Sequence, residues 1–202
     1  MTNDPLKHLR RDKKLAVALK NFTFEKRNRE ENIALYLCLS IISQQLSTRV
    51  ARVLCDRFLD LFTGEEPTCV RILQVEKTTL RSIGLSESKC NYIHNVCNYF
   101  QEHKLSDDAL HAMSNEEVIA TLIPIKGVGN WTIQMLLMFA MSRDDVFAPD
   151  DLGIQKAMIG LYKLDAPSPK ELKKQMETIS ETWKPFRTYA CLALWSWKDA
   201  KN

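Results

Sequence analysis

Two glycines separated by one residue, Gly127 and Gly129, stand between two apolar segments with helical spacing. The first segment ends near Leu122 and the second begins at Asn130, so the chain must reverse within a few residues. Glycine suits such a hairpin because the turn needs backbone dihedrals that a Cβ obstructs. The backbone N–H groups of the turn also lie at the positive end of the second helix, where a phosphate is favoured. The glycine pair alone fits close helix packing as well as it fits anion binding.

Signals for the start of a helix recur along the chain, whereas the alternation of apolar and polar residues that marks a strand is rare. Each signal is an Asp or Ser whose side chain accepts a hydrogen bond from the first turn. Proline at the first helical position or a Glu three residues later strengthens several of them. They are Asp4-Pro5, Ser47, Ser86, Ser114 with Glu117, and Ser168-Pro169 with Glu171. The sequence therefore predicts an all-α fold.

Apolar periodicity sets the expected extent of these helices. The first should run from Pro5 to about Leu19, and the segment 33–45, apolar nearly all round, predicts a buried central helix. A helix capped by Ser47 should bury one face, made of Val50, Val53, Leu54, Phe58 and Leu61. The remaining expected helices include 118–122 and about 130–141 on either side of the glycine turn, one that begins at 149–151, and a last one from about 185 through 197.

The chain length of 202 residues allows roughly 70% of the unfolded surface to be buried, enough for one well-packed domain or two closely associated lobes. The six cysteines are scattered and no secretory signal precedes them, so we expect reduced thiols in an intracellular protein. The net charge of +3 is too small to identify a nucleic-acid binder. No apolar run has the length of a membrane span, and the four histidines show no metal-ligand spacing.

Two further features follow the glycine turn: Trp131 lies two residues after Gly129, and the carboxylate pair Asp150-Asp151 follows Pro149. With segments elsewhere, this set resembles the helix-hairpin-helix DNA glycosylase superfamily and, within it, the AlkA-type 3-methyladenine DNA glycosylases. The matching segments are KGVGNWT (126–132), DVFAPDDLGI (145–154), SIISQQLS (40–47) and WKPFRTYACLALW (183–195). They extend from the first third of the chain nearly to its end.

The resemblance implies a fold and a partner. Residues 1–202 would form a single glycosylase unit, a two-lobed helical bundle with a cleft between the lobes. One lobe would comprise approximately 1–32 and 146–202, and the other approximately 33–145 with the hairpin at 118–141. The expected partner is double-stranded DNA containing damaged bases. The protein is expected to be a monomer that does not bind membranes and that lies in the bacterial cytoplasm or the eukaryotic nucleus.

The resemblance also assigns contacts with DNA. An enzyme that cuts the bond between base and sugar must rotate the nucleotide out of the duplex and fill the gap. The position that matches this plug is Gln45, with Leu46 beside it; from the residues alone, Gln44 and Gln45 are an ordinary polar helix end. The hairpin residues expected to contact the DNA are Lys126, Gly127, Val128, Gly129 and Thr132.

Aromatic residues are expected to line the base pocket. Trp131 and Trp195 match pocket positions of the family, and Met135 lies one turn beyond Trp131. Purines alkylated at N3 or N7 carry a positive charge, and the face of an indole ring attracts cations. A buried tryptophan or a methionine on a helix face is more often part of a core, and Trp183 and Trp197 are interpreted that way.

The carboxylate pair divides into a catalytic and a structural residue. Adjacent residues on a helix point about 100° apart, so Asp150 and Asp151 cannot both face one pocket. The match to the catalytic aspartate of the family falls on Asp151, two residues before Gly153, and Asp150 is interpreted as the N-cap. Asp151 would stabilise an oxocarbenium-like sugar or orient a water molecule. A general acid is less necessary, because a cationic base already leaves readily.

Two departures narrow the expected activity. Lyase-active members of the superfamily carry a lysine just after the hairpin, where this chain has Trp131, so the expected reaction is simple hydrolysis that leaves an abasic site. Cys90 and Cys97 have the spacing that begins the iron–sulfur loop of endonuclease III-like relatives, but no cysteines complete it. We therefore interpret both as core residues and expect no cofactor, no metal ligands and no iron–sulfur cluster; whether a cation binds the hairpin carbonyls stays open.

The resulting hypothesis is a monofunctional DNA glycosylase that excises alkylated purines such as 3-methyladenine and 7-methylguanine in base excision repair. One alternative is an enzyme of the same fold that acts on oxidised or deaminated purines, because the shape of the pocket decides the base. Another is a non-catalytic relative that binds DNA lesions. A purely structural hairpin module fits the complete motif set less well.

Overall fold

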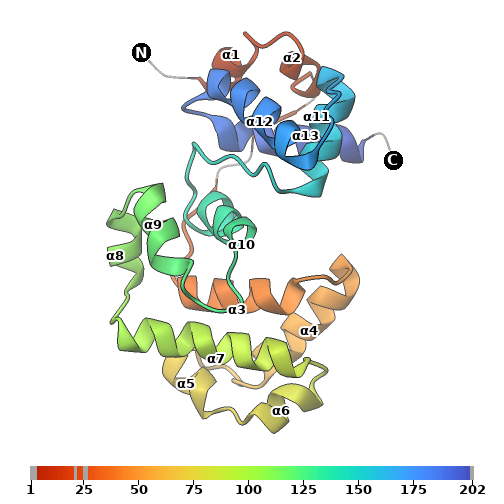
Figure 1. The fold of residues 1–202 in the computed structure, drawn as a ribbon. Coiled ribbons are helices and arrows are strands. Elements are labelled where there is room, and N and C mark those ends of the chain that lie inside the picture. The colour runs from red at the N-terminus through yellow and green to blue at the C-terminus, as the bar shows by residue number, and fades with distance from the viewer. Residues whose placement is uncertain (1–3, 21, 25–26, 201–202) are drawn as a thin grey trace. The chain divides into compact units, whose positions relative to one another are not determined.

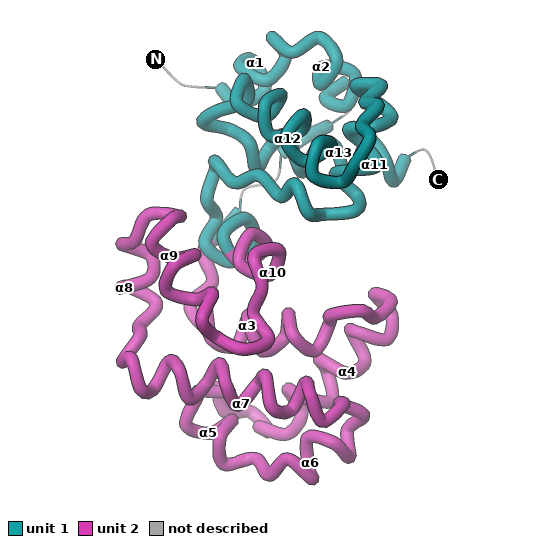
Figure 2. The backbone as a smooth tube through the Cα atoms, in the orientation of Figure 1, with its two compact units in different colours: residues 1–28, 137–202 teal, residues 29–136 magenta. Residues whose placement is uncertain are grey.

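A computed structural model describes residues 4–20, 22–24 and 27–200, and all regular structure in these ranges is helical. The chain forms two compact units (Figures 1 and 2), unit 1 from residues 1–28 with 137–202 and unit 2 from residues 29–136. The all-α prediction is confirmed. The unit boundaries lie at 28/29 and 136/137, beside the approximate 32/33 and 145/146 that the resemblance implies; the loop that follows residue 140 is tied to unit 1 by hydrogen bonds.

Unit 2 is built around α3 (Ile33–Ser43), which packs against both α4 and α7. Its apolar residues Leu37, Ile41 and Ile42 are completely buried, as the central-helix prediction requires. The other helices are α4 (Thr48–Asp60), α5 (Cys69–Gln74), α6 (Lys77–Ser82), α7 (Glu87–Glu102), α8 (Asp107–Ala112), α9 (Asn115–Leu122) and α10 (Asn130–Met135).

The buried face of α4 differs from the prediction. Ala51, Leu54 and Phe58 face the core, whereas the side chains of Val50 and Val53 are 46% and 44% exposed. The buried residues have the spacing i, i+3, i+7 of a single helix face, and each valine precedes one of them, which rotates it by about 100° toward solvent. The expected apolar face was therefore correct for Leu54 and Phe58 but wrong for the two valines.

Unit 1 contains the two ends of the chain. Its elements are α1 (Pro5–Leu9), α2 (Leu15–Ala18), a π-helix (Leu136–Ala140, which begins at the boundary), α11 (Leu152–Tyr162), α12 (Pro169–Ser180), a 3₁₀-helix (Glu181–Trp183) and α13 (Arg187–Asp199). Helix α13 packs against α11 and α2. Its residues Ala190, Cys191 and Leu194 are completely buried, which confirms the prediction that the last helix is inserted among others.

The predicted first helix, from Pro5 to about Leu19, is broken into α1 and α2 by Asp12. The Oδ1 atom of Asp12 accepts hydrogen bonds from the backbone N–H groups of Lys14 and Leu15, at 3.0 and 3.1 Å. A short acidic side chain that bonds the backbone just after it competes with helix continuation. The Oδ2 atom of Asp12 accepts from the Tyr162 hydroxyl at 2.6 Å and from Nε1 of Trp183 at 3.0 Å.

We expect Asp12→Ala to lower the stability of unit 1 by about 2 kcal/mol at neutral pH, because four donors lose a charged acceptor. Burial opposes ionisation of Asp12, but hydrogen bonds from Trp183, Tyr162 and the backbone outweigh it and hold the pKa below its ordinary value. The stabilisation is thus complete above the ordinary pKa of an aspartate and is lost as the pH falls through the lowered pKa. Urea unfolding at several pH values measures both effects; Asp165→Ala, an exposed carboxylate of unit 1, is the control. Equal losses in the two variants would contradict the role of Asp12.

Candidate active site and nucleic-acid interface

The glycine turn of unit 2 forms the predicted hairpin between α9 and α10. The N-terminus of α9 carries the predicted capping box of Ser114 and Glu117. Gly129 is the N-cap of α10, and Gly127 has a φ of +108°, a region that favours glycine. A Cβ on Gly127 would lie 2.4 Å from Cγ of Tyr92, whereas a Cβ on Gly129 would meet nothing within 4 Å. Gly127 is therefore required for the fold of the turn, and Gly129 faces open space.

The predicted DNA contacts of the hairpin differ in their exposure. Lys126 and Gly129 are exposed, but the N–H of Val128 already donates to the carbonyl of Ile125 at 3.0 Å. Among the described residues the N–H of Gly129 has no acceptor. Thr132 is only 3% exposed, and its hydroxyl accepts a hydrogen bond from another side chain of unit 2. The structure thus leaves Lys126 and Gly129 as the accessible groups, and the side chains of Val128 and Thr132 belong to the core.

The predicted plug lies in the turn between α3 and α4. Helix α3 ends at Ser43, and Gln45 adopts a left-handed conformation with a φ of +59°. Such a backbone is uncommon outside glycine and is concentrated at functional sites. The side chains of Gln45 and Leu46 are both exposed, whereas that of Gln44 is turned toward the hairpin. Exposure is what a residue that fills a gap in a duplex requires.

The predicted pocket residues of unit 2 lie on α10. Trp131 is 41% exposed, an unusual state for so large an apolar ring, whereas Met135 is only 9% exposed. The two residues are four apart and share one helix face. The predicted regular helix from 130 to about 141 is wrong beyond Met135, because the chain continues as a π-helix. π-Helical turns are frequently found at functional sites.

The N-cap of α11 is the other aspartate of the pair from the one predicted. Helix α11 begins after Asp151, whose Oδ1 accepts the N–H of Ile154 at 2.9 Å, so Asp151 and not Asp150 is the N-cap. The reason is a turn closed by the N–H of Asp151 and the carbonyl of Ala148, which delays the helix by one residue. Asp150 instead forms an ion pair with Nζ of Lys173 at 2.8 Å.

Trp195 holds the Asp151 carboxylate. Its Nε1 donates to the same Oδ1 atom at 2.8 Å, and its ring is stacked at 5.9 Å on that of Phe139 from the π-helix. A Cβ on Gly153 would lie 3.0 Å from Asp151 Oδ1 and 2.9 Å from the Trp195 ring, so glycine leaves room for this bond. The two N–H donors, from Ile154 and Trp195, fix the position of this carboxylate oxygen. The structure thus brings together Asp151, Trp195 and Phe139 in unit 1.

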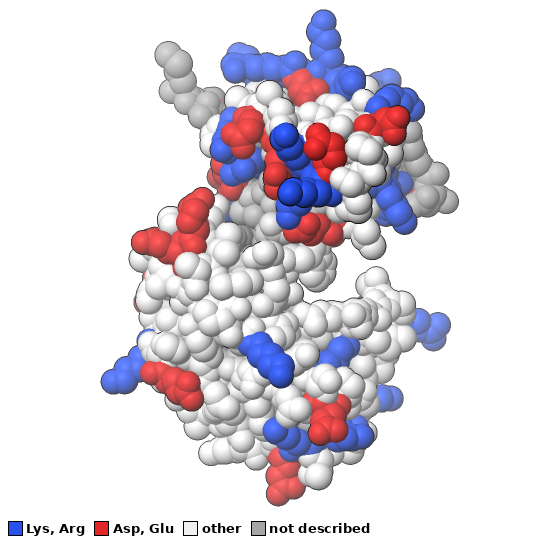
Figure 3. Space-filling view, viewed as in Figure 1, with Lys and Arg blue, Asp and Glu red and all other residues white. Residues whose placement is uncertain are grey.

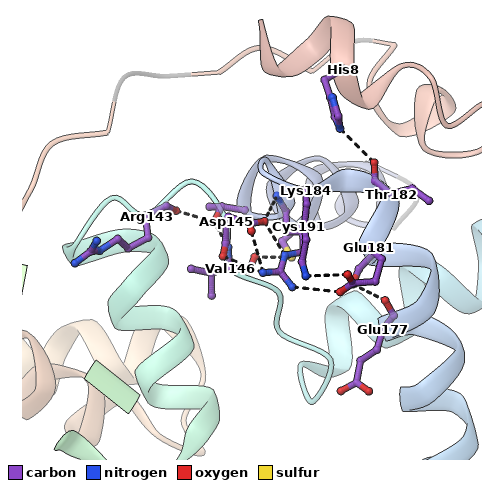
Figure 4. Close-up of polar contacts among 12 residues, drawn as sticks. His8, Arg143, Asp145, Val146, Glu177, Glu181, Thr182, Lys184 and Cys191 are labelled. Carbon is purple, nitrogen blue, oxygen red and sulfur yellow. Dashed lines mark hydrogen bonds and ion pairs between the residues drawn. The ribbon is translucent and has the colours of Figure 1, made fainter. Parts of the chain in front are cut away.

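The loop before Asp151 is fixed to the start of α13 by a polar cluster, part of which is shown in Figure 4. The guanidinium of Arg187 donates to both carboxylate oxygens of Asp145, at 2.6 and 2.9 Å. The buried hydroxyl of Thr188 accepts the N–H of Val146 at 3.0 Å. These contacts position the chain that leads into the aspartates.

Sequence reasoning missed Phe139 and the Trp195–Asp151 hydrogen bond. Phe139 lies in an apolar run, LLMFA, where nothing distinguishes an exposed ring from core residues. The bond to Asp151 had one local signal, the glycine at position 153, because a glycine inside a helix commonly marks a close approach. Sequence reasoning also missed the contacts that join the plug turn, the hairpin and α7, which are described below. The residues that make them are Gln44, Lys89, Tyr92 and Asn95.

The charges and the cysteines add little to the site. Figure 3 shows lysine and arginine interspersed with acidic residues on the visible faces of both units, without one large basic area. Cys90 and Cys97 are buried on α7, which confirms that they are core residues.

In the part of the chain that the structure describes, no three histidine, cysteine or acidic side chains are grouped as metal ligands. No helix in that part is long and apolar enough to span a membrane.

Comparison with known proteins places this geometry in a family. Residues 38–182 match the HhH-GPD superfamily base excision DNA repair protein family. A putative DNA-3-methyladenine glycosylase of Bacillus subtilis, YfjP, is 33% identical over 171 residues, 80% of this chain and 58% of the relative. The chain therefore spans little more than half the length of that relative.

Two solved structures are similar along nearly the whole chain. The DNA-3-methyladenine glycosidase of Bacillus halodurans has a TM-score of 0.84 at 29% identity, covering 100% of this chain and 93% of that one. The 3-methyladenine DNA glycosylase of Schizosaccharomyces pombe, solved in complex with abasic DNA, has a TM-score of 0.81 at 30% identity, covering 98% and 97%. The resemblance drawn from the sequence motifs is confirmed: the chain belongs to the HhH-GPD superfamily of base excision DNA repair proteins.

Proposed function

We propose that this chain is a monofunctional DNA glycosylase that hydrolyses the N-glycosidic bond of alkylated purines, with 3-methyladenine and 7-methylguanine among its substrates. The observation that carries the proposal is the Asp151 carboxylate, held by two N–H donors at the start of α11 in a chain whose relatives are named for 3-methyladenine excision. The protein would act as a monomer on damaged duplex DNA, in the bacterial cytoplasm or the eukaryotic nucleus.

The residues of unit 2 fit the steps before chemistry. Lys126 supplies a point charge and Gly129 an unhindered backbone N–H for phosphate, and such contacts position the DNA without reading its sequence. Gln45 would fill the gap that an extruded nucleotide leaves. The exposed indole of Trp131 offers an electron-rich face to a cationic base, an attraction of about 0.5–2 kcal/mol.

Asp151 of unit 1 would act on the sugar. As the bond to the base breaks, the sugar gains positive charge, and a preorganised carboxylate stabilises that charge at little reorganisation cost. The carboxylate would also orient the attacking water. An alkylated purine leaves as a neutral base, so no general acid is needed. Trp131 occupies the position after the hairpin where a lyase carries lysine, so the product would be an intact strand with an abasic site.

No metal or cofactor takes part in this proposal. The hairpin carbonyls that could bind a cation already accept hydrogen bonds from side-chain amides: that of Gly127 from Gln44 at 3.2 Å and that of Lys126 from Asn95 at 3.1 Å. A cation there would have to share or displace these bonds. Addition of a chelator should therefore leave base release unchanged.

A panel of single-lesion duplexes tests the base specificity. Separate duplexes would carry 7-methylguanine, hypoxanthine or 8-oxoguanine, and released bases would be identified by chromatography. We expect release of the methylated purine to be fastest by a wide margin, because only that base is cationic. Fastest release of hypoxanthine or 8-oxoguanine would instead assign the chain to deaminated or oxidised purines. Tight binding of all lesions without release would identify a non-catalytic lesion binder.

We further expect Gln45→Ala to slow base release from duplex DNA by about tenfold and from single-stranded DNA hardly at all, since only a duplex leaves a gap that needs a plug. The ratio of the two rates under single-turnover conditions is the measurement. Leu46→Ala, which removes the neighbouring exposed side chain, shows whether the effect is specific to Gln45. The same loss on both substrates would exclude the plug role.

A further inference from the structure

We propose that helix α7 is a positioning platform that holds the plug turn (Gln44–Leu46) and the hairpin loop (125–129) at a fixed separation. All of these residues belong to unit 2. The platform consists of Lys89, Tyr92 and Asn95, spaced three residues apart along one slanted row of α7, together with Gln44 of the plug turn. The inference rests on the proposed function, because it explains how phosphate grip and gap filling are coupled.

Lys89 of α7 holds the plug turn through two backbone carbonyls. Its Nζ donates to the carbonyls of Ile42 and Gln44, at 2.7 and 2.9 Å. The last carbonyls of a helix receive no hydrogen bond from an N–H of the same helix, and a cation at this end is favoured by the helix dipole. These two hydrogen bonds direct the Lys89 amine toward the turn, and its partial burial lowers the pKa of Lys89. Lys89 is therefore a structural donor to the turn and not a surface cation for phosphate.

Gln44 connects the plug turn to the hairpin. Its side-chain Nε2 donates to the carbonyl of Gly127 at 3.2 Å and to the hydroxyl of Thr132 at 3.3 Å. Its own carbonyl is one of the two that Lys89 binds. Because Gln44 directly precedes Gln45, any movement of Gln44 changes the direction in which the plug side chain points.

The hairpin is held by the other two platform residues. The Tyr92 ring lies directly against Gly127, at the place where a Cβ would come within 2.4 Å of Cγ. Nδ2 of Asn95 donates to the carbonyl of Lys126 at 3.1 Å. The carbonyls of two consecutive hairpin residues, 126 and 127, are thus bound by two different elements, one by α7 and one by the plug turn.

This arrangement has a catalytic consequence. A hairpin that grips phosphate at one point of a duplex places the plug at the gap only if the distance between the two loops is fixed before binding. A rigid connection removes the need to order the loops during the reaction, and small misplacements of such groups lower rates strongly. Lys89 and Gln44 would therefore act through Gln45 and not on the DNA itself.

A double-mutant cycle between Lys89 and Gln45 tests the platform. Lys89→Met keeps most of the side-chain stem but removes the donor, and we expect it to slow base release from duplex DNA about tenfold. In the Gln45→Ala background the same substitution should have little further effect, because the group that it positions is already absent. Lys77→Met, which removes an exposed lysine of unit 2, is the control for loss of charge and should be near wild type.

A loss of the same size in both backgrounds would overturn the proposal, because a merely structural role slows release whether or not the plug is present. If Lys89→Met fails to fold, as judged by its thermal unfolding, Gln44→Met takes its place in the cycle with the same expectation. A second readout does not need catalysis: the fluorescence of 2-aminopurine opposite an abasic-site analogue in a duplex reports insertion of the plug.

The fluorescence readout separates the two proposals. If the wild-type chain releases no base but changes the 2-aminopurine signal, the proposed enzymatic function fails and the platform is still tested by whether Lys89→Met removes that change. If Lys89→Met inserts the plug as well as wild type does, the platform is wrong, whatever the wild-type rate of base release.

Discussion

Replacing Asp151 by asparagine is expected to slow base release by about 100- to 1000-fold while leaving affinity for lesion-containing DNA equal or higher. Asparagine is a competent N-cap, and its Oδ1 can accept the same bonds from Ile154 and Trp195, so the fold should be retained. What is lost is the negative charge that stabilises the sugar as the bond breaks. Such a group contributes to the transition state far more than to binding.

Asp150→Asn is the matched control for the Asp151 variant. It removes an equal charge one residue away, along with an exposed ion pair to Lys173, which is worth at most about 1 kcal/mol. We expect most of the activity to remain. Single-turnover rates and affinity for a duplex with an abasic-site analogue distinguish the variants. An active Asp151→Asn protein beside an inactive Asp150→Asn protein would move the catalytic role to the neighbouring carboxylate.

The two hairpin glycines should respond differently to alanine. Gly127→Ala combines a φ of +108° with a Cβ that would overlap the Tyr92 ring, so we expect a loss of stability of about 3 kcal/mol and loss of DNA binding. Gly129→Ala should fold normally, because its Cβ points into open space. That added methyl group would stand in the way of a phosphate, and we expect DNA affinity to fall about tenfold for damaged and undamaged duplexes alike.

Thermal unfolding together with binding to both kinds of duplex measures this contrast. The family resemblance assigned both glycines to phosphate contact; because a Cβ on Gly127 would meet the Tyr92 ring, only Gly129→Ala tests that role without disturbing the fold. Normal DNA affinity in Gly129→Ala would remove the hairpin from the DNA interface. A weakened affinity for damaged DNA alone would assign Gly129 to the recognition of the base.

Local signals explain how much of the fold could be predicted. The caps Asp4, Ser47, Ser86, Ser114 and Ser168 all occur where expected, since each cap depends on residues within one turn. The break between α1 and α2 was missed although Asp12 bonds the backbone just after it; what the sequence could not show is that Tyr162 and Trp183, 150 and 171 residues away, hold the same carboxylate. The one-residue error at α4 reflects the limit of periodicity as a measure of helix phase, whereas the error at α11 arises from the turn that precedes Asp151.

The same distinction applies to the candidate site. The motifs singled out Asp151, Trp131 and Gln45 as candidate site residues, and their roles stay predictions. They could not reveal that Trp195 donates to Asp151 or that Lys89 binds the end of α3, because both contacts join elements far apart in sequence. Residue type alone also could not separate the exposed Gly129 from the packed Gly127, since the difference lies in the Tyr92 ring.

Enzyme-dependent release of free 3-methyladenine from methylated duplex DNA tests the central claim most directly. The wild-type chain would be incubated with the duplex, the free base measured by chromatography over time, and the strands sized before and after alkali. We predict release well above spontaneous depurination, with strands that stay intact until alkali breaks them at the abasic sites. No release above the spontaneous rate, or strand cleavage without alkali, would contradict the hydrolytic glycosylase proposed for this chain.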